Sequence, residues 1–486
     1  MTTLVTYNGG VFEPPTETSV DEWHTELRRR LDSGGRLVAM FSDGLVPNVG
    51  LVAVVADDRD AQLGVLRART TASTWRSLAA DHPQVQLFER EIHERSGLVP
   101  DGHLWLKPVR YTRASDTIGV TDFYRVEGEG VHEVAVGPVH AGVIEPGHFR
   151  FQCHGEKVFH LEISLGYQHR GIEAALLRGP VKRRLHLCET LAGDTTIAHT
   201  TAYCEALEAL SETRVPPRAL AIRAIALELE RLANHVGDLG ALAGDVAFLP
   251  TASFCGRIRG DLLNATATLC GNRFGRSLVV PGGVAFDVPH PAELVSRLTR
   301  IERDARGAAD LLWDTPSVLS RFEGTGIVTT ETARTLGLVG PAARASGLAR
   351  DVRQDHPSGL YRLAQLPTAV IETGDVFGRA LVRWMESVRS FAFVQEQLKA
   401  LPSGPVRVEP EPLGPSAMAV SLAEGWRGEV AHILATDAHG EVATHRVVDP
   451  SFHNWMGLAL ALRNEAISDF PLCNKSFNLS YCGHDL

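Results

Sequence analysis

The segment from Ala219 to Val236 constrains the fold more than any other part of the sequence. Its apolar side chains recur at spacings of three and four residues, the period of an α-helix with one buried face. The apolar stripe comprises Ile222, Ile225, Leu229, Leu232 and Val236. The polar side chains that lie largely off the stripe are Arg223, Glu230, Arg231 and Asn234. The pattern predicts an amphipathic helix in a helical middle part of the chain.

Other periodic segments extend this prediction to the whole chain. Helices are expected at 22–31, 257–269, 292–315 and 376–400, and strands at 37–41, 51–56, 417–422, 428–436 and 442–448. The polar segment 88–95 is predicted to be a surface loop or short helix, and 454–486 a helix followed by an irregular tail. We expect an α+β fold with a small α+β domain at 1–125, joined to a mainly helical domain with a small antiparallel sheet at 130–486.

Charge and hydropathy restrict the partners of the chain. The formal net charge is −10. Nucleic acid is therefore not expected as a partner, because phosphate binding needs a basic face. No apolar run reaches the roughly 18 residues of a membrane-spanning helix, and the N-terminus has no secretory signal pattern. Any association with a membrane is expected to come through partner subunits.

The seven cysteines are scattered, and no two of them form a C-x-x-C pair. This spacing is typical of reduced thiols in a cytosol. An iron–sulfur cluster is usually held by four clustered thiolates. We therefore expect no cluster in this chain.

Six ordered motifs cover most of the chain from residue 137 onward. They are GPVH (137–140) with EPGHFRF (145–151), GYQHRGIE (166–173), IAHTTAY (197–203), LELERLANHVGDLG (227–240), NRFGRSLVVPGGV (272–284) and the terminal SFNLSYCGHDL. Ordered motifs over about 350 residues are far more specific than any one of them. This part of the chain resembles the shared family of [NiFe]-hydrogenase large subunits and quinone-site subunits of respiratory complex I.

The N-terminal unit is similar to the small subunit that caps the quinone-site subunit in complex I, through FEREIHERSGLVPDGH (88–103). A fusion of two such units is typical of the large subunit of formate hydrogenlyase and its membrane-bound relatives. The resemblance implies an oxidoreductase subunit on the cytoplasmic side of the cell membrane that is not catalytic alone. The implied partners are an iron–sulfur small subunit, a ferredoxin-like subunit and membrane antiporter-like subunits.

Hydrogenases of this family hold nickel and iron with two C-x-x-C pairs, because these metals need soft thiolate ligands. The resemblance places the first pair at Ala192 and Thr195 and the second at Ser480 and Gly483. None of the four is a cysteine, so we expect the metal site to be lost. Relocation of a ligand to Cys188 or Cys482 stays open, as does the alternative that both are small buried hydrophobic residues. The chain ends where a metal-loaded relative is cut after metal insertion.

Complex I relatives bind a quinone in the vacated cavity, with a histidine and a tyrosine at the headgroup. The resemblance places this histidine at His148 and the tyrosine at Gly193, which has no hydroxyl. His148 and Glu145 are therefore candidates for proton transfer and for binding a quinone in the cavity. The alternative is a turn glutamate and a hydrogen-bonded core histidine.

Other charged residues of the motifs have two interpretations each. In GYQHRGIE, the residues His169, Arg170 and Glu173 are candidates for an interface with the iron–sulfur subunit, or Arg170 and Glu173 form an intrahelical ion pair. Asp194 is a candidate proton relay or ligand anchor, or it caps the following helix. His199 is a second relay candidate, or a packed core histidine.

Three functions stay open from the sequence. The first is a metal-free redox-complex subunit that docks an iron–sulfur subunit and binds a quinone or another acceptor. The second is an active formate hydrogenlyase-type hydrogenase, and the third is a structural scaffold. The electron donor and the transported ion are properties of other subunits.

Overall fold

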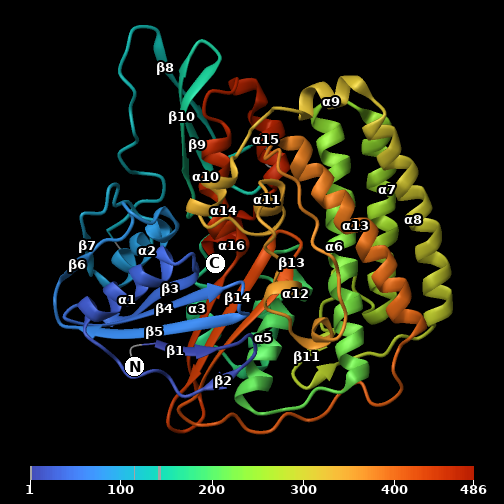
Figure 1. Cartoon of the computed structure of the whole chain (residues 1–486), viewed down its shortest axis with the longest axis horizontal. Coiled ribbons are helices and arrows are strands. Elements are labelled where there is room, and N and C mark those ends of the chain that lie inside the picture. Colours follow the sequence, from blue (N-terminus) through green and yellow to red (C-terminus); the bar gives the residue numbers. More distant parts are fainter. Residues whose placement is uncertain (1–2, 114, 141–143) are drawn as a thin grey trace.

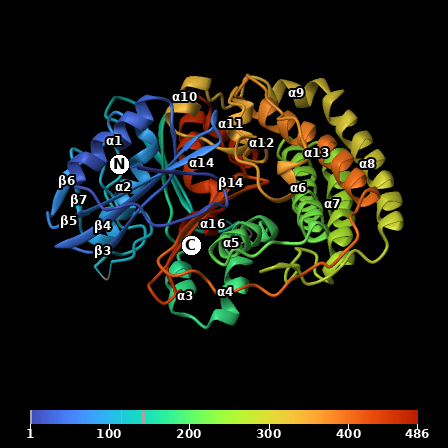
Figure 2. The same cartoon turned by 60° about the horizontal axis from the view of Figure 1, so that its bottom comes forward.

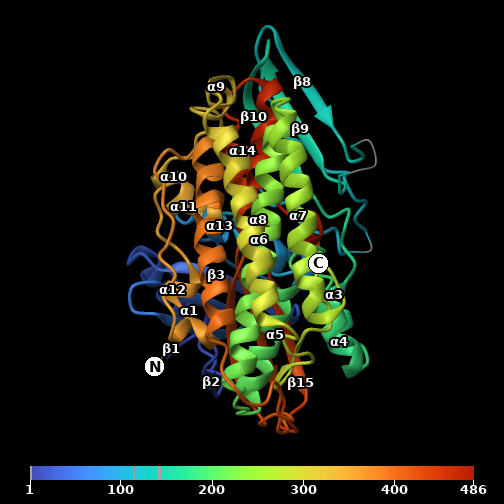
Figure 3. The same ribbon diagram turned by 90° about the vertical axis from the view of Figure 1, so that its right-hand side faces the viewer.

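The computed structural model describes residues 3–113, 115–140 and 144–486. Its core is a bundle of four long helices that run side by side in Figures 1 and 3. They are α6 (Pro217–Asp245), α7 (Leu249–Cys270), α8 (Pro291–Trp313) and α13 (Val376–Lys399). Each contains one of the predicted helices, all of which are confirmed. Proline in the first turn of α6, α7 and α8 suits a helix start, where its missing N–H would have no intrahelical partner.

Helix α6 is buried on both faces, which corrects the prediction of one buried face. The side chains of Arg223, Glu230, Arg231 and Asn234 are all buried together with the apolar stripe. The polar face is covered because charged groups from distant segments pack against it, such as Glu386 of α13, whose carboxylate accepts from Arg231. The sequence period locates the helix, but it does not reveal what covers the polar side.

The N-terminal unit is an antiparallel sheet flanked by two helices, shown in blue in Figure 1. Its strands are β1 (Thr3–Thr6), β3 (Arg36–Leu45), β4 (Asn48–Asp57) and β5 (Gln62–Thr70), in the order β1-β5-β4-β3. Helix α1 (Val20–Asp32) begins with a capping box of Ser19 and Glu22. The helix expected at 22–31 and the strands expected at 37–41 and 51–56 are confirmed.

The segment 88–95 lies in helix α2 (Gln86–Ser96) and is largely buried, so its prediction as a surface segment is wrong. Glu94 explains why a polar sequence is buried here. Its carboxylate accepts hydrogen bonds from the backbone N–H groups of Val109, Arg110 and Thr112. A buried acid that is satisfied in this way fixes the chain that follows the helix.

A second sheet joins the N-terminal unit to the bundle. Its strands are β13 (Met418–Gly425), β14 (Gly428–Thr436) and β15 (Val442–Val448), with β2 (Val11–Phe12) paired to β13, which confirms the predicted antiparallel sheet. One face packs against the N-terminal sheet through residues such as Val420 and Ile433. The other face packs on α5 (Thr196–Leu210). The two predicted units thus share a hydrophobic core, and their division into domains stays a prediction.

The third sheet projects from one end of the molecule (Figure 1). It contains β8 (Val131–Val136), β9 (His148–His154) and β10 (Lys157–Ser164). The tail is helical rather than irregular, in contrast to the prediction. It forms α14 (Pro450–Ala461), α15 (Phe470–Phe477) and α16 (Tyr481–Asp485). The tail carries several apolar residues that enter the main core, including Phe477, Leu479 and Leu486.

Short elements complete the fold. Helices α3 (Ile172–Arg178) and α4 (Val181–Cys188) lie beside α5 in Figure 2. The remaining elements are β6 (Thr74–Arg76), β7 (Val99–Asp101), β11 (Val279–Val280), β12 (Gly283–Val284), α9 (Pro316–Phe322), α10 (Thr330–Thr335), α11 (Gly340–Ala345) and α12 (Val352–Asp355). Within the described residues, no helix combines the length and the apolar character needed to cross a bilayer.

Candidate functional site

The two-residue turn between β13 and β14 consists of Trp426 and Arg427. The Arg427 guanidinium donates two hydrogen bonds to the Asp194 carboxylate, at 2.5 and 2.9 Å. Its Nε donates to the carbonyl oxygen of Asn478 at 2.5 Å. The guanidinium therefore joins the segment before α5 to the segment before α16. These are the two segments in which the family resemblance places metal ligands.

Asp194 is held from both its side chain and its backbone. Burial favours the neutral acid, but the charge and hydrogen bonds of Arg427 outweigh it and lower the pKa of Asp194. The backbone oxygen of Asp194 accepts from Trp426 Nε1 at 3.1 Å and from Asn234 Nδ2 at 3.0 Å. The Asp194 side chain is still 32% exposed, so this carboxylate can be reached by a ligand.

Asp194 does not cap α5, so that alternative is wrong. The first turn of α5 instead meets Glu230 of α6, whose carboxylate accepts from the N–H groups of Ile197 and Ala198 at 2.6 and 3.2 Å. Burial raises the pKa of Glu230 to about 8, although these two hydrogen bonds oppose the rise. The role expected for Asp194 at the helix start belongs to a residue of another helix.

The second segment closes against the first through Asp449. Ser480 accepts a hydrogen bond from the N–H of Gly483 and so caps α16. A Cβ atom added at Gly483 would lie 2.6 Å from Cγ of Asp449, which is closer than real side chains approach. Ala192 and Thr195 of the first segment are both buried. The geometry at position 483 therefore suits glycine and excludes a larger residue without a shift.

Three buried histidines form a chain that begins at this place. The Asp449 carboxylate lies 3.2 Å from His199 Nε2, and His199 Nδ1 lies 3.2 Å from His432 Nε2. His432 Nδ1 in turn lies 3.0 Å from His445 Nε2. Burial lowers the pKa of His432 well below its usual range and that of His445 to about 3. The imidazoles of His432 and His445 are therefore neutral at physiological pH. His199 is both packed in the core and part of this hydrogen-bonded path.

Glu145 and His148 lie on either side of Gly147, close to the start of α16. The Glu145 carboxylate accepts from the N–H groups of Tyr481 and Cys482, at 3.1 and 3.4 Å. His148 Nδ1 lies 3.2 Å from the Gly137 carbonyl. Its Nε2 is buried, and no described residue offers it a hydrogen-bond partner. Glu145 thus ties the loop before β9 to the tail, and His148 Nε2 stays without a partner among the described residues.

The backbone at Gly193 borders open space. A Cβ atom built there meets no heavy atom within 4 Å among the described residues beyond its chain neighbours. Gly193 is the position at which the resemblance places the tyrosine of complex I. The structure thus leaves room at the position where the relatives place a hydroxyl.

The residues His169, Arg170 and Glu173 contact different groups. Arg170 donates two hydrogen bonds to the carbonyls of residues 190 and 191, each at 2.9 Å. Glu173 pairs with Arg95 and Arg446, so the alternative of an Arg170–Glu173 ion pair is wrong. His169 and Glu173 line one cavity of about 260 Å³ together with charged residues of α2. Glu173 thus links the N-terminal unit to β15, Arg170 holds the segment before α5, and His169 Nδ1 lies 2.8 Å from the Asp485 carbonyl of the tail.

A larger and more apolar cavity, of about 350 Å³, lies where the N-terminal unit meets β10 and α14. Aromatic side chains on its wall are Trp105, Tyr111, Tyr124, His160 and Trp455. The only motif residue of the tail on its wall is His484. This cavity could not be expected from the sequence, because its wall comes from six separate segments.

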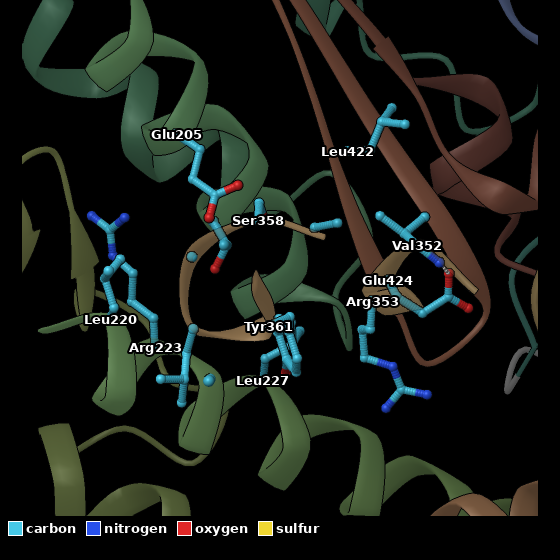
Figure 4. Close-up of a pocket in the computed structure, with 15 residues that line it drawn as sticks. Glu205, Leu220, Arg223, Leu227, Val352, Arg353, Ser358, Tyr361, Leu422 and Glu424 are labelled. Carbon is cyan, nitrogen blue, oxygen red and sulfur yellow. Dashed lines mark hydrogen bonds between the residues drawn. The ribbon is translucent and has the colours of Figure 1, made fainter. Parts of the chain in front are cut away.

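Behind the turn, a small cavity of about 20 Å³ has room for about one water molecule. Figure 4 shows its charged wall, with Glu205 from α5, Arg223 from α6 and Glu424 from β13. Burial raises the pKa of Glu205 to about 7. This cavity is too small for an organic ligand, so it belongs to the buried charge network of the framework.

Sequence reasoning missed Arg427, Asp449, His432 and His445. Sequence signals exist for two of them, His432 and Arg427. His432 occupies an inward-facing position of a strand that alternates as V-x-H-x-L from Val430 to Leu434. Arg427 stands between strands that end and begin with glycine, where a tight turn projects its side chain.

Comparisons with known proteins show which family the chain belongs to. Residues 245–413 match the family model described as respiratory-chain NADH dehydrogenase, 49 Kd subunit. The chain is 32% identical to a carbon monoxide-induced hydrogenase of Rhodospirillum rubrum, over 71% of this chain and 97% of that protein. It is 33% identical to formate hydrogenlyase subunit 5 of Escherichia coli, over 72% of this chain but only 62% of that protein.

Among solved structures, the fold is similar to a chain of a membrane-bound sulfane sulfur reductase, an archaeal respiratory membrane complex. The TM-score is 0.68 at 22% identity, covering 75% of this chain and all of that chain. Identity this low supports the fold alone. Taken with the hydrogenase relatives, the match shows that the chain belongs to the family of membrane-bound hydrogenase and complex I-like large subunits.

Proposed function

We propose that this chain is a subunit of a membrane-associated oxidoreductase related to complex I and formate hydrogenlyase, in which an ion pair stands where relatives hold nickel. The observation that carries the proposal is the Arg427–Asp194 pair, which joins the two ligand-bearing segments. The relatives named above are a hydrogenase and a formate hydrogenlyase subunit, and the matching family model describes a respiratory-chain dehydrogenase subunit, which supports redox function in a complex.

The residues at the four ligand positions do not fit a nickel–iron centre. Ala192, Thr195, Ser480 and Gly483 supply no thiolate, whereas such a centre needs four soft ligands. A cysteine at 483 would also collide with Asp449. The proposed function therefore involves no nickel chemistry.

A relocated nickel site at the two nearby cysteines has little support. Cys482 lies 3.4 Å from the Ser480 hydroxyl and close to Glu145. Cys188 groups instead with His432 and His445. The two thiols therefore have separate sets of neighbours.

A quinone or another polar acceptor would bind between His148 and the Asp194–Arg427 pair. His148 Nδ1 donates to the Gly137 carbonyl, so its Nε2, which has no partner among the described residues, accepts a proton and as the imidazolium donates to an acceptor carbonyl, while the partly exposed Asp194 carboxylate can receive a proton. The open space at Gly193 offers room for the headgroup. Electrons would come from an iron–sulfur cluster of the partner small subunit, since we propose no cluster and no metal redox centre for this chain.

The docking face for that small subunit would include the GYQHRGIE segment, through His169, Arg170 and Glu173. A ferredoxin-like subunit and antiporter-like membrane subunits would complete the complex on the cytoplasmic side of the membrane. The support is the membership of relatives in such complexes and the high charge density around Glu173, Arg95 and Arg446.

The test is acceptor reduction by the purified complex, with a soluble quinone analogue and an artificial electron donor. His148→Gln should lower quinone turnover at least about tenfold. A positioned proton donor typically contributes a factor of about 100 or more, so this threshold lies below the usual effect. His154→Gln is the matched control, because His154 lies on the same strand, β9, but is exposed. Equal turnover of both variants would contradict a role for His148 and favour a structural scaffold.

An active hydrogenase is the second candidate, because the first two relatives are named as hydrogen-linked enzymes. Hydrogen uptake or evolution by the same complex, above that of a preparation lacking this chain, would establish it. It would also refute the metal-free cavity.

A further inference from the structure

The far end of the histidine chain carries a second group of metal-binding side chains. One donor atom each of Cys188, His432 and His445 lies within 4.8 Å of the other two. The three side chains come from the end of α4, from β14 and from β15, and all are buried. This group is separate from the four positions at which relatives hold nickel.

The hydrogen-bond chain fixes which nitrogen of His432 faces this group. Burial opposes ionisation of Asp449, but hydrogen bonds from His199 and from the Ser451 N–H lower its pKa, so it is a carboxylate. With a neutral His199, its Nε2–H donates to Asp449 and its Nδ1 accepts from His432 Nε2–H. The lone pair on His432 Nδ1 is left pointing toward His445 Nε2.

Such a carboxylate–histidine–histidine series is the arrangement that orients ligands in metal sites. Two nitrogens bound at 2.0–2.1 Å to one cation lie about 3.4 Å apart. His432 Nδ1 and His445 Nε2 are 3.0 Å apart, so a shift of a few tenths of an ångström and a change of tautomer at His445 alone would admit a cation. The two imidazoles are therefore close to their ligated geometry, and the Cys188 sulfur lies within 4.8 Å of both donor nitrogens.

We propose that Cys188, His432 and His445 bind a single thiophilic cation, and that monovalent copper is the ion that fits. A thiolate selects soft ions, and one thiolate with two imidazoles is a trigonal copper set. Structural zinc takes four ligands, whereas three are gathered here. One thiolate and one monovalent cation also leave the buried site neutral, which avoids the cost of a buried net charge.

Binding would replace the proton of the Cys188 thiol, which is released to solvent. A cysteine binds a metal as the thiolate, so the thiol proton is lost on binding, whereas an imidazole binds through the lone pair of its neutral form. One proton should thus be released for each cation bound.

The experiment measures metal retained by the full chain, in its complex, after expression with added copper or zinc and dialysis against a chelator. Anaerobic handling keeps copper monovalent. We expect stoichiometric copper in the wild-type protein, and at least about tenfold less in Cys188→Ser and in His445→Gln. Cys255→Ser is the matched control, because Cys255 is also a buried free cysteine but lies on α7. It should retain copper.

X-ray absorption on the wild-type protein keeps the test independent of variant folding. One sulfur and two nitrogen ligands around copper are the expected result. Absence of retained copper, a different ligand set, or undiminished copper in Cys188→Ser would overturn the proposal. Retention of zinc with four ligands in place of copper would overturn the assignment of a monovalent ion.

Discussion

Two charged regions meet at the β13–β14 hairpin and differ in how their charges are paired. Behind α6, Glu386 accepts hydrogen bonds from Arg231, Arg344 and His235, and all four side chains are buried. At the tip of the turn, Asp194 binds Arg427 but remains 32% exposed. The first region is a closed framework, whereas the second can exchange a partner with a ligand. A buried charge alone thus does not indicate a ligand-binding site. A charged group that a ligand can reach does.

The largest expected effect is on the framework. Glu386→Ala would leave Arg231 and Arg344 without their shared carboxylate in the core. An uncompensated buried charge costs about 3–5 kcal/mol, so we expect a loss of that size in the free energy of unfolding, measured by denaturant titration. A loss below about 1 kcal/mol would show that the region is not a rigid framework.

The next effect is a pH dependence of the same region. Burial lowers the pKa of His235 to about 4, while in the unfolded chain it lies near 6.5. The unfolded state therefore binds the proton first, and stability falls as pH drops from about 6.5 toward 4. Between pH 7 and 5 this histidine should account for about 2 kcal/mol of lost stability.

His235→Gln keeps a donor for Glu386 and removes the titration. Denaturant titrations at pH 7 and 5 should therefore show a smaller drop for the variant than for the wild-type protein. An identical drop in the two proteins would mean that His235 is not held neutral in the fold.

The ion pair at the turn should contribute less to stability. Asp194 is about one third exposed, and water can replace part of what Arg427 supplies. A double-mutant cycle of Asp194→Asn and Arg427→Gln should give a coupling of about 1 kcal/mol in the free energy of unfolding. A coupling as large as the loss expected for Glu386→Ala, about 3–5 kcal/mol, would show that the two regions do not differ in this respect.

The smallest effect is expected on the outside of the bundle. Arg306 and Glu302 form an ion pair one turn apart on α8, and the Arg306 side chain is 48% exposed. Arg306→Ala should change the free energy of unfolding by no more than about 0.5 kcal/mol. It serves as the surface reference for the three predictions above, and a larger loss would indicate a hidden partner for Arg306.

The sequence predicted the elements better than their surroundings. The helical period locates α6, and alternation locates β13, β14 and β15, because both patterns are local. The partners of Arg231 are not local, since Glu386 and Glu424 stand more than 150 residues away in the sequence. A local pattern therefore locates α6 but does not reveal which groups cover its polar face.

The site was predicted in part for the same reason. Motifs indicated Glu145, His148 and Asp194, and the structure shows what each contacts. Arg427 and Asp449 were missed because their roles depend on a tight turn and on a backbone approach at Gly483. The glycines on either side of the turn indicate the turn at Arg427, but the approach of Asp449 to Gly483 leaves no pattern in a single sequence.

Nickel analysis of the complex decides whether the Arg427–Asp194 ion pair takes the place of a nickel site. The complex would be purified anaerobically from cells grown with ample nickel, and its nickel measured per copy of this chain. We expect no nickel above that of a preparation lacking the chain. Stoichiometric nickel that is lost in a Cys482→Ser variant would contradict it.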